Sequence, residues 1–338
     1  MKDTFRSLNA LRFIFIICIF LFHFTDVKGG VSYFPEGYCG VTFFFILSGF
    51  LLAYSKGDKV RLGKLKTTKF VFDRLRKIYP LYFITVVYFI VKSTIAHYPC
   101  WKMAAVHLLL LQSWIPDESV YYCWNYPTWF LSSLMLCYVL FVPIIRFANR
   151  NKTVTSCIFV ALLIVYFSFI HFVPDSQQEY FYYIFPPFRL IDFCIGILLS
   201  EFYKRNKMLL SKSSFIQNSF LEFFSILLLI GVIMLASDVP LILRRESLYW
   251  LPMSVLIIVM AFTEGNSILS TLFNNKMMQM LGASTMVFFL FHGIYIDVIR
   301  QLVGHLEPSY IVPMAVFLSV VSIGIHISAD TCRKMLQR

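Results

Sequence analysis

Apolar segments long enough to cross a membrane recur along the chain, with short polar stretches between them. A helix needs about 20 mainly apolar residues to cross the core of a bilayer. The pattern predicts ten spanning helices, at residues 8–25, 40–54, 78–96, 127–147, 153–172, 182–203, 215–236, 248–263, 279–301 and 309–330. The first is expected to be retained, because a signal peptide precedes a soluble body rather than further apolar segments. We predict an all-α polytopic membrane bundle, with residues 1–338 forming one integral membrane domain.

The composition supports a membrane protein. Of the 338 residues, 59% are hydrophobic and 14% are charged, whereas a soluble domain is about half apolar and about a quarter charged. A net charge of +12 would suggest a nucleic-acid partner if the protein were soluble. Here the basic residues lie between apolar segments, so we expect the lipid bilayer as the partner and no nucleic acid.

The distribution of Lys and Arg predicts the topology. With the N-terminus inside, 22 of the 30 Lys and Arg residues fall in cytoplasmic segments, four in external segments and four within spans, with Arg146 at the end of its span counted as cytoplasmic. Cytoplasmic loops of membrane proteins carry such an excess of Lys and Arg. Both termini are therefore predicted to be cytoplasmic. We expect a multi-pass protein of the plasma (inner) membrane.

The longest predicted external segment covers about residues 97–126. Its apolar stretch at 104–114 is too short to span easily, so we predict a re-entrant or interfacial helix there. Cys100 and Cys123 lie in this segment, and a disulfide between them stays an open question. The eight Cys show no CxxC pair and no metal-ligand spacing, so no bound metal is expected.

Two ionisable residues stand out in the first span. Arg12 and His23 are eleven positions apart, which is about 1,100° of helix rotation and places them within about 20° of each other on one face. Their separation along the axis is about 16.5 Å. Taken singly, Arg12 is explained by a side chain that snorkels to the interface and His23 by an interfacial hydrogen bond. Their shared face favours a functional interpretation.

Other ionisable residues are predicted at membrane depth, where charge is costly and usually faces a partner or a cavity. Arg189 and Asp192 are three positions apart and can neutralise each other, so a structural ion pair is the simplest interpretation. His292 lies within the ninth predicted span. There, a packing histidine is at least as compatible with the sequence as a functional one.

Five stretches match, in order, the motifs of one protein family. They are Arg-x10-His, a Phe-Phe-x-x-Ser-Gly-Phe string, a basic loop running into a span, a Trp-x-Leu-Ser segment and a span that ends with a histidine. They lie at Arg12–His23, Gly40–Leu52, Phe70–Phe83, Pro127–Met135 and Leu281–Ile296. With these motifs the chain resembles the acyltransferase family 3 membrane proteins, which include O-antigen and exopolysaccharide acetylases. Ten spans with both termini inside agree with this resemblance.

The chain departs from the family pattern at three positions. Asn9, Thr42 and Leu134 stand where family members often carry Asp, Asp and Glu. An uncharged residue cannot fix an arginine or a histidine through an ion pair. We therefore expect the partners of Arg12 and His23, or the acceptor, to differ from those of family members.

The resemblance implies transfer of an acyl group, usually acetyl from acetyl-CoA, to a hydroxyl of a cell-surface or lipid-linked carbohydrate. Succinyl and longer acyl donors fit the same chemistry. Such a transfer needs a base to take the hydroxyl proton, and histidine is the side chain best poised for this near pH 7. We predict His23 as the base, with an acyl-histidine intermediate as an alternative.

The phosphates of CoA require cations at the inner leaflet. Arg12 is predicted to bind them and to act with His23 in catalysis, and Arg74, Arg76 and Lys77 at the foot of the third span are further candidates. The guanidinium group presents a fork that suits phosphate oxygens. The alternative for the basic segment 56–77 is a topology signal combined with attraction to anionic lipid.

The remaining candidates are assigned to the substrate path. They are Ser48, Trp129, Ser132, Arg189, Asp192 and His292. Ser48 with Gly49 is more simply a point of close helix approach, and Trp129 an interfacial aromatic residue. A transporter or flippase of a lipid-linked glycan stays as a rival function, because intramembrane charges also mark substrate paths. A structural or sensory role would not explain why Arg12 and His23 share one face of the first span.

Overall fold

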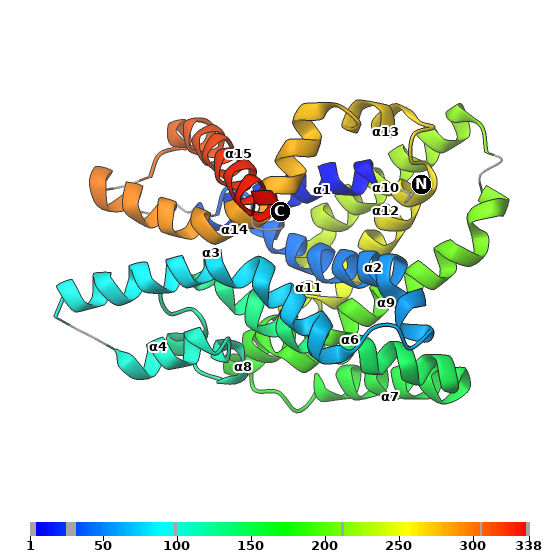
Figure 1. The fold of residues 1–338 in the computed structure, drawn as a ribbon, viewed down its shortest axis with the longest axis horizontal. Coiled ribbons are helices and arrows are strands. Elements are labelled where there is room, and N and C mark those ends of the chain that lie inside the picture. Colours follow the sequence, from blue (N-terminus) through cyan, green and yellow to red (C-terminus); the bar gives the residue numbers. More distant parts are fainter. Residues whose placement is uncertain (1–4, 25–31, 98–99, 211–212, 305, 336–338) are drawn as a thin grey trace. The chain divides into compact units, whose positions relative to one another are not determined.

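The computed structural model describes residues 5–24, 32–97, 100–210, 213–304 and 306–335. These residues form helices and the turns that connect them, with no β-strand among them (Figure 1). The longer helices are α1 (Arg6–His23), α2 (Cys39–Arg61), α3 (Thr67–Ile95), α6 (Trp129–Arg150), α7 (Lys152–Phe169), α9 (Pro186–Leu210), α10 (Phe215–Leu235), α12 (Trp250–Phe262), α14 (Lys276–Val303) and α15 (Ile311–Met335). The shorter elements that the site involves are η1 (Pro35–Tyr38), α4 (Trp101–Leu108), η2 (Gln112–Trp114), η4 (Tyr180–Ile184), α11 (Leu241–Arg244) and α13 (Ile268–Phe273). The remaining short ones are α5 (Glu118–Tyr121), η3 (Tyr126–Thr128), α8 (Asp175–Glu179), η5 (Ala236–Asp238), η6 (Ser247–Tyr249) and η7 (Pro308–Tyr310).

Each predicted span corresponds to one of the longer helices. Within the described ranges, eight helices are long and apolar enough to cross a membrane. A bent pair, Asp175–Ile184 followed by Pro186–Lys207 with a 40° bend, qualifies as one more span, and Ser247–Phe262 is a shorter apolar helix. The predicted all-α polytopic membrane bundle is confirmed. The cytoplasmic location of both termini stays a prediction.

Several helices extend beyond the predicted spans, and α2 and α3 are clear examples. Spans were expected at 40–54 and 78–96, whereas α2 continues to Arg61 and α3 already begins at Thr67. The additional turns are rich in Lys and Arg, which favour helix nearly as strongly as Leu does. The helices therefore continue where the apolar pattern ends. The stretch 104–114 forms the end of the eight-residue helix α4 and the turn η2, in line with an element too short to span.

The described chain divides into two compact units. The first contains residues 1–41, 208–233 and 255–338, and the second contains residues 42–207 and 234–254. Each unit is described by itself below, and the expectation of one integral membrane domain over residues 1–338 stays a prediction.

In the first unit, α1 packs against α14, which in turn packs against α15. Gly282 permits the close approach of α1 and α14, because a Cβ atom there would overlap the backbone carbonyl of Asn9. Glu222 on α10 is fully buried, and its carboxylate accepts hydrogen bonds from Thr263 Oγ1 (2.7 Å) and Ser267 Oγ (2.5 Å). These bonds fix α10 to the turn between α12 and α13.

In the second unit, α2 and α9 cross at very short distance. A Cβ atom at Gly49 would overlap the backbone carbonyl of Phe193, and one at Gly196 would overlap that of Ile46. Small residues at both sides of the crossing explain this approach. The interpretation of Gly49 as a point of close helix approach is thereby confirmed.

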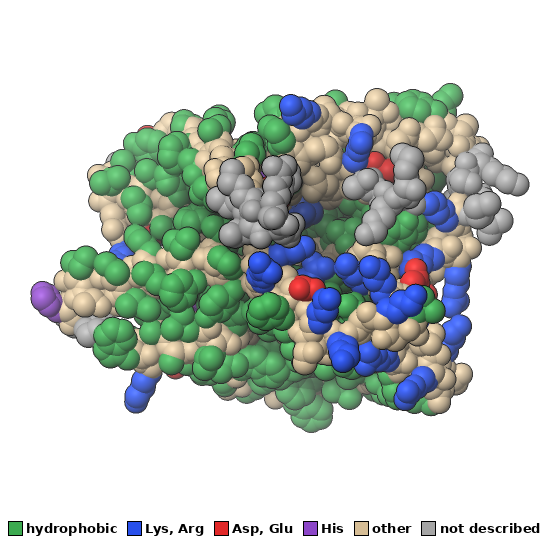
Figure 2. Space-filling model, in the orientation of Figure 1, with side chains coloured by type: hydrophobic (Ala, Val, Ile, Leu, Met, Phe, Trp, Pro, Cys, Tyr) green, Lys and Arg blue, Asp and Glu red, His purple; other side chains and the backbone are tan. Residues whose placement is uncertain are grey.

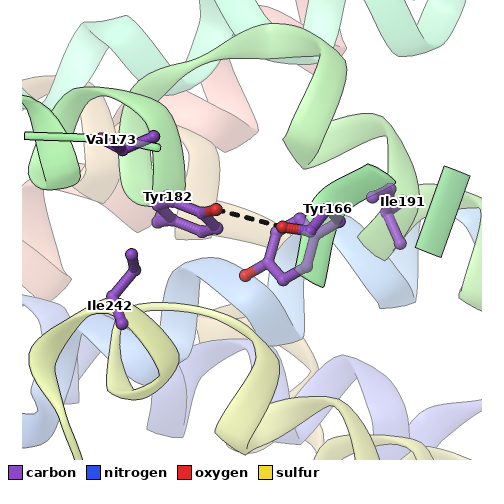
Figure 3. Packing of buried hydrophobic residues seen from close by; sticks show 5 residues of the cluster. All are labelled: Tyr166, Val173, Tyr182, Ile191 and Ile242. Carbon is purple, nitrogen blue, oxygen red and sulfur yellow. Dashed lines mark hydrogen bonds between the residues drawn. The ribbon is translucent and has the colours of Figure 1, made fainter. Parts of the chain in front are cut away.

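A second part of this core is aromatic (Figure 3). Tyr166 on α7 and Tyr182 in η4 are both fully buried, and their rings meet edge to face with centroids 5.0 Å apart. The Tyr182 hydroxyl donates a hydrogen bond to the Tyr166 carbonyl over 3.0 Å. Apolar residues from the neighbouring segments complete the cluster: Val173, Ile191 and Ile242. The cluster joins α7, η4, α9 and α11.

The Gly196→Ala variant tests the α2–α9 crossing. Its added methyl group would meet backbone atoms of Ile46 and Phe50 that cannot rotate away, so we expect a loss of about 1–3 kcal/mol of stability. Thermal unfolding of the purified protein in detergent measures this. Gly231→Ala on α10 is the matched control, because nothing lies within 4 Å of its Cβ position. Equal unfolding midpoints for the two variants would contradict the close crossing.

Candidate active site

The packing of α1 against α14 brings two histidines together in the first unit. The rings of His23 and His292 have centroids 5.4 Å apart and planes inclined by 32°. His23 is the last residue of α1 and is half-buried, whereas His292 lies within α14 and is fully buried. The sequence offered both residues as separate candidates, and the structure places their rings in contact.

The tautomer of His292 follows from one hydrogen bond. Its Nδ1 atom lies 2.7 Å from the Phe289 carbonyl oxygen, which can only accept. Nδ1 therefore carries the hydrogen, and in the neutral ring Nε2 is left as an acceptor. This bond also fixes the plane of the His292 ring relative to α14.

Aromatic side chains and a buried carboxylate surround the end of α1. The Phe22 ring contacts the His23 ring at 5.0 Å and meets the Tyr38 ring edge to face at 5.5 Å. The Tyr38 hydroxyl donates a hydrogen bond to Glu36 Oε2 over 2.5 Å, and both residues are buried. Sequence reasoning missed Glu36 and Tyr38 because they lie in η1, outside the predicted spans. An acidic residue just before an apolar helix was the available signal.

Arg12 is held near the other end of α1. Its Nη1 atom lies 3.5 Å from Asn9 Oδ1, and Asn9 Nδ2 donates to the carbonyl and to the side-chain oxygen of Gln279 on α14 (3.0 and 3.1 Å). A neutral amide thus contacts Arg12 at the position where family members often have Asp. The helix α1 is continuous between Arg12 and His23, so the rise of about 16.5 Å expected from the sequence applies.

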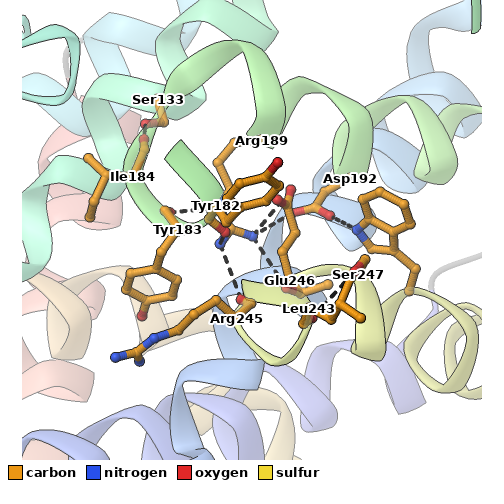
Figure 4. A network of polar contacts seen from close by, with 12 residues as sticks. Ser133, Tyr182, Tyr183, Ile184, Arg189, Asp192, Leu243, Arg245, Glu246 and Ser247 are labelled. Carbon is orange, nitrogen blue, oxygen red and sulfur yellow. Dashed lines mark hydrogen bonds and ion pairs between the residues drawn. The ribbon is translucent and has the colours of Figure 1, made fainter. Parts of the chain in front are cut away.

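In the second unit, Arg189 is fully buried and satisfies carbonyls that a helix break exposes (Figure 4). Pro186 and Pro187 have no N–H, so the carbonyls of Tyr182 and Tyr183 have no helical donor four residues later. Arg189 Nε donates to the Tyr183 carbonyl (2.8 Å), and Nη2 donates to the Tyr182 carbonyl (3.1 Å). The arginine thereby holds the bend between η4 and α9.

The charge of Arg189 is balanced within the same network. Its Nη1 atom lies 2.8 Å from Asp192 Oδ2 and 3.6 Å from Glu246 Oε1, and the Trp250 indole N–H donates to Asp192. The expected Arg189–Asp192 ion pair is present. Burial raises the pKa of Glu246 well above its ordinary value, which favours the neutral carboxyl. The Arg189 charge is then balanced by Asp192.

Two of the departures from the family pattern fall in this unit. Thr42 Oγ1 accepts a hydrogen bond from Arg189 Nη1 over 3.4 Å. Leu134 is buried and lines a small cavity with the rings of Tyr79, Tyr82 and Tyr138. The structure thus connects Thr42 with Arg189, a residue that the sequence had not linked to it, while Leu134 faces an apolar environment.

The hydroxyl candidates of this unit have structural partners. Ser132 Oγ donates to the Leu110 carbonyl (2.6 Å) and lies 2.6 Å from Ser113 Oγ. Trp129 is buried, with its ring 4.8 Å from that of Tyr183, so it is not an exposed interfacial residue. Ser48 is half-buried on α2. Whether any of them lies on a substrate path stays a prediction.

The candidate phosphate ligands Arg74, Arg76 and Lys77 lie on the basic first half of α3. Arg76 and Lys77 are exposed, whereas Arg74 is half-buried with its guanidinium carbon 5.3 Å from the centre of the Phe70 ring. Figure 2 shows further Lys and Arg side chains gathered over the ends of α2 and α9. Arg61 at the end of α2 and Lys204 on α9 pair with Asp58 (2.8 and 3.1 Å). These side chains give the second unit a cationic surface, and phosphate binding there stays a prediction.

The described His, Cys, Asp and Glu side chains form neither a metal-binding group nor a disulfide. Among the described residues, no group of three or more His, Cys, Asp or Glu side chains could hold a metal ion. Cys100 and Cys123 are both free thiols in this structure, the first exposed and the second half-buried.

The fold and the site define a polytopic helical membrane protein in which His23 of the first helix contacts His292 of α14, and Arg12 lies on the same first helix. A family model described as an acyltransferase domain matches residues 5–328, so the chain belongs to this acyltransferase family. It is also similar to the acyltransferase MdmB of Streptomyces mycarofaciens, with 27% identity over 222 residues. That match covers 57% of this chain and 56% of the relative, so the chain spans little more than half of that protein. No solved structure matches the chain.

Proposed function

We propose that this protein is a membrane acyltransferase that moves an acyl group, acetyl in the simplest case, from cytoplasmic acyl-CoA to a hydroxyl of a cell-surface or lipid-linked carbohydrate. One observation carries the proposal. Within a chain of the acyltransferase family, α1 presents Arg12 and His23 about 16.5 Å apart on one continuous helix. That distance is comparable to an extended pantetheine arm, so one residue can bind phosphate while the other meets the thioester.

His23 is assigned the role of general base. The acceptor hydroxyl attacks the thioester carbonyl carbon while His23 takes its proton, and a C–O bond forms as the C–S bond breaks. The proton then passes from His23 to the CoA sulfur, which restores the neutral histidine. A base held in this position typically contributes about 10²–10⁴-fold to the rate.

Purified protein in detergent, supplied with labelled acetyl-CoA and a carbohydrate acceptor, tests the proposal directly. Transfer of label to the carbohydrate with release of free CoA is the expected result. Binding of a lipid-linked glycan without any consumption of acetyl-CoA would contradict acyl transfer and favour a flippase. In cells, loss of an acetyl mass increment from the surface glycan of a deletion strain would identify the natural acceptor.

Arg12→Gln tests the phosphate contact. A charge-assisted hydrogen bond is worth about 1.5–3 kcal/mol, so we expect KM for acyl-CoA to rise by about 10- to 150-fold with kcat little changed. Arg150→Gln is the matched control, because it removes the same charge from an exposed position on α6. A fall in kcat at constant KM would assign Arg12 to catalysis instead of binding.

A further inference from the structure

The contact between His292 and His23 leads to an inference that rests on the proposed function. We propose that His292 is a positioning residue for His23: it fixes the orientation of the His23 ring and stabilises the charge that this ring acquires when it takes the acceptor proton. His292 is not required to touch the acyl donor or the carbohydrate.

The surroundings of His292 argue against a role in packing alone. Its neighbours in the chain, Phe288, Phe289 and Leu290, are apolar and buried like His292 itself. A histidine in such a place costs free energy that a phenylalanine would not, because its ring nitrogens must be desolvated. The ring also stacks on Phe288 with 22° between the planes, so it occupies space that an aromatic hydrocarbon would fill equally well.

The hydrogen bond to Phe289 gives His292 a defined chemical role. With Nδ1 donating to that carbonyl, the neutral His292 ring offers only an acceptor at Nε2. A neutral ring that carries an acceptor nitrogen and has its centroid 5.4 Å from that of His23 would stabilise a cationic His23. Two cationic imidazoles at this separation would repel strongly at a buried site, so His292 stays neutral while His23 cycles between neutral and protonated forms.

The proton balance of the reaction is unchanged by this arrangement. The acceptor hydroxyl gives its proton to His23, the C–O bond forms, and the thiolate that leaves as the C–S bond breaks takes the proton from His23. His292 gains and loses no proton. It acts by keeping one nitrogen of His23 aimed at the hydroxyl.

Three variants separate the functions of the His292 ring. His292→Phe keeps the aromatic volume and removes both nitrogens, His292→Asn keeps a donor near the Nδ1 position, and His292→Gln keeps a polar group near the Nε2 position. We expect kcat to fall at least about tenfold in His292→Phe and His292→Asn, with KM for acyl-CoA unchanged. His292→Gln should recover part of that loss at an equal unfolding midpoint.

A double variant shows whether His292 acts through His23. If it does, His292→Phe added to His23→Ala should lower the rate no further, because the residue that His292 positions is already absent. A purely structural His292 would instead multiply the two losses, and that outcome would overturn the proposal.

The chemical reactivity of His23 provides a readout independent of transfer activity. The folded protein is treated with diethyl pyrocarbonate and digested, and carbethoxylation of the His23 peptide is measured by mass spectrometry. The reaction should be about tenfold slower in His292→Phe than in the protein without the substitution. Slower modification in a protein that transfers no acyl group would refute the proposed function and support the positioning. Unchanged modification, alongside transfer activity that His23→Ala abolishes, would overturn the positioning and keep the proposed function.

Discussion

The His23→Ala variant is expected to lose acyl transfer by about 10²–10⁴-fold, the contribution typical of a positioned general base. The physical reason is that His23 lies at the end of α1 with its ring against His292, and alanine leaves no group there to take the acceptor proton. KM for acyl-CoA should change little, because the phosphate contacts assigned to Arg12 lie at the opposite end of the helix. Initial rates with labelled acetyl-CoA in detergent measure both constants.

Two comparisons make this prediction specific. His171→Ala removes an exposed histidine between α7 and α8 and should retain full activity. His23→Gln keeps a polar side chain but cannot accept a proton at neutral pH, so it should be nearly as inactive as His23→Ala. Label that stays on the protein after rapid denaturation at neutral pH would point to an acyl-histidine intermediate. A folded His23→Ala protein with undiminished turnover would refute the base assignment.

The sequence predicted the fold class well. A bilayer leaves few alternatives to a helix for an apolar stretch of about 20 residues, so each of the ten predicted spans corresponds to a helix. In the described ranges, however, eight of these helices, or nine with the bent pair, are long and apolar enough to cross a membrane. The predicted ends were poorer at α2 and α3, since basic residues extend a helix beyond its apolar part without changing the hydropathy signal.

The candidate site was only partly predictable. Arg12 and His23 share one helix, so their alignment follows from helical geometry. The contact of His23 with His292 was not predictable, because these residues are far apart in the sequence and only packing decides that α1 and α14 are neighbours. The close approach of α1 and α14 at Asn9 depends on a single residue, because Gly282 has no side chain there.

The second unit repeats this division between local and distant contacts. The Arg189–Asp192 pair was expected from a spacing of three residues and is present. Its other partners were not expected, because two of them are carbonyls exposed by a proline break and a third is Glu246, which lies in a loop before α12. Backbone carbonyls and a carboxylate in a loop leave no periodic signal in the sequence.

The Arg189→Met variant is expected to be the most destabilising single change in the second unit. Methionine would occupy much of the same space but leave the Asp192 charge and the carbonyls of Tyr182 and Tyr183 buried without their donor. Removal of one partner from a buried ion pair costs about 3–5 kcal/mol. Reaction of the buried Cys137 with a thiol-specific reagent during heating, followed on the Cys137 peptide by mass spectrometry, reports the unfolding midpoint. That thiol is accessible only after the helices separate, whereas exposed thiols such as Cys100 react at once.

Two further variants identify the cause of this loss. Arg61→Met removes an arginine that pairs with Asp58 and Glu201 while a quarter of its side chain stays exposed, and an exposed pair is worth only about 0–1 kcal/mol. Arg189→Met combined with Asp192→Leu should recover part of the stability, because the unpaired charge is gone. Recovery should stay incomplete, since the two carbonyls freed by Pro186 and Pro187 still lack donors. If Arg189→Met unfolds at the same midpoint as Arg61→Met, the network does not hold the bend between η4 and α9.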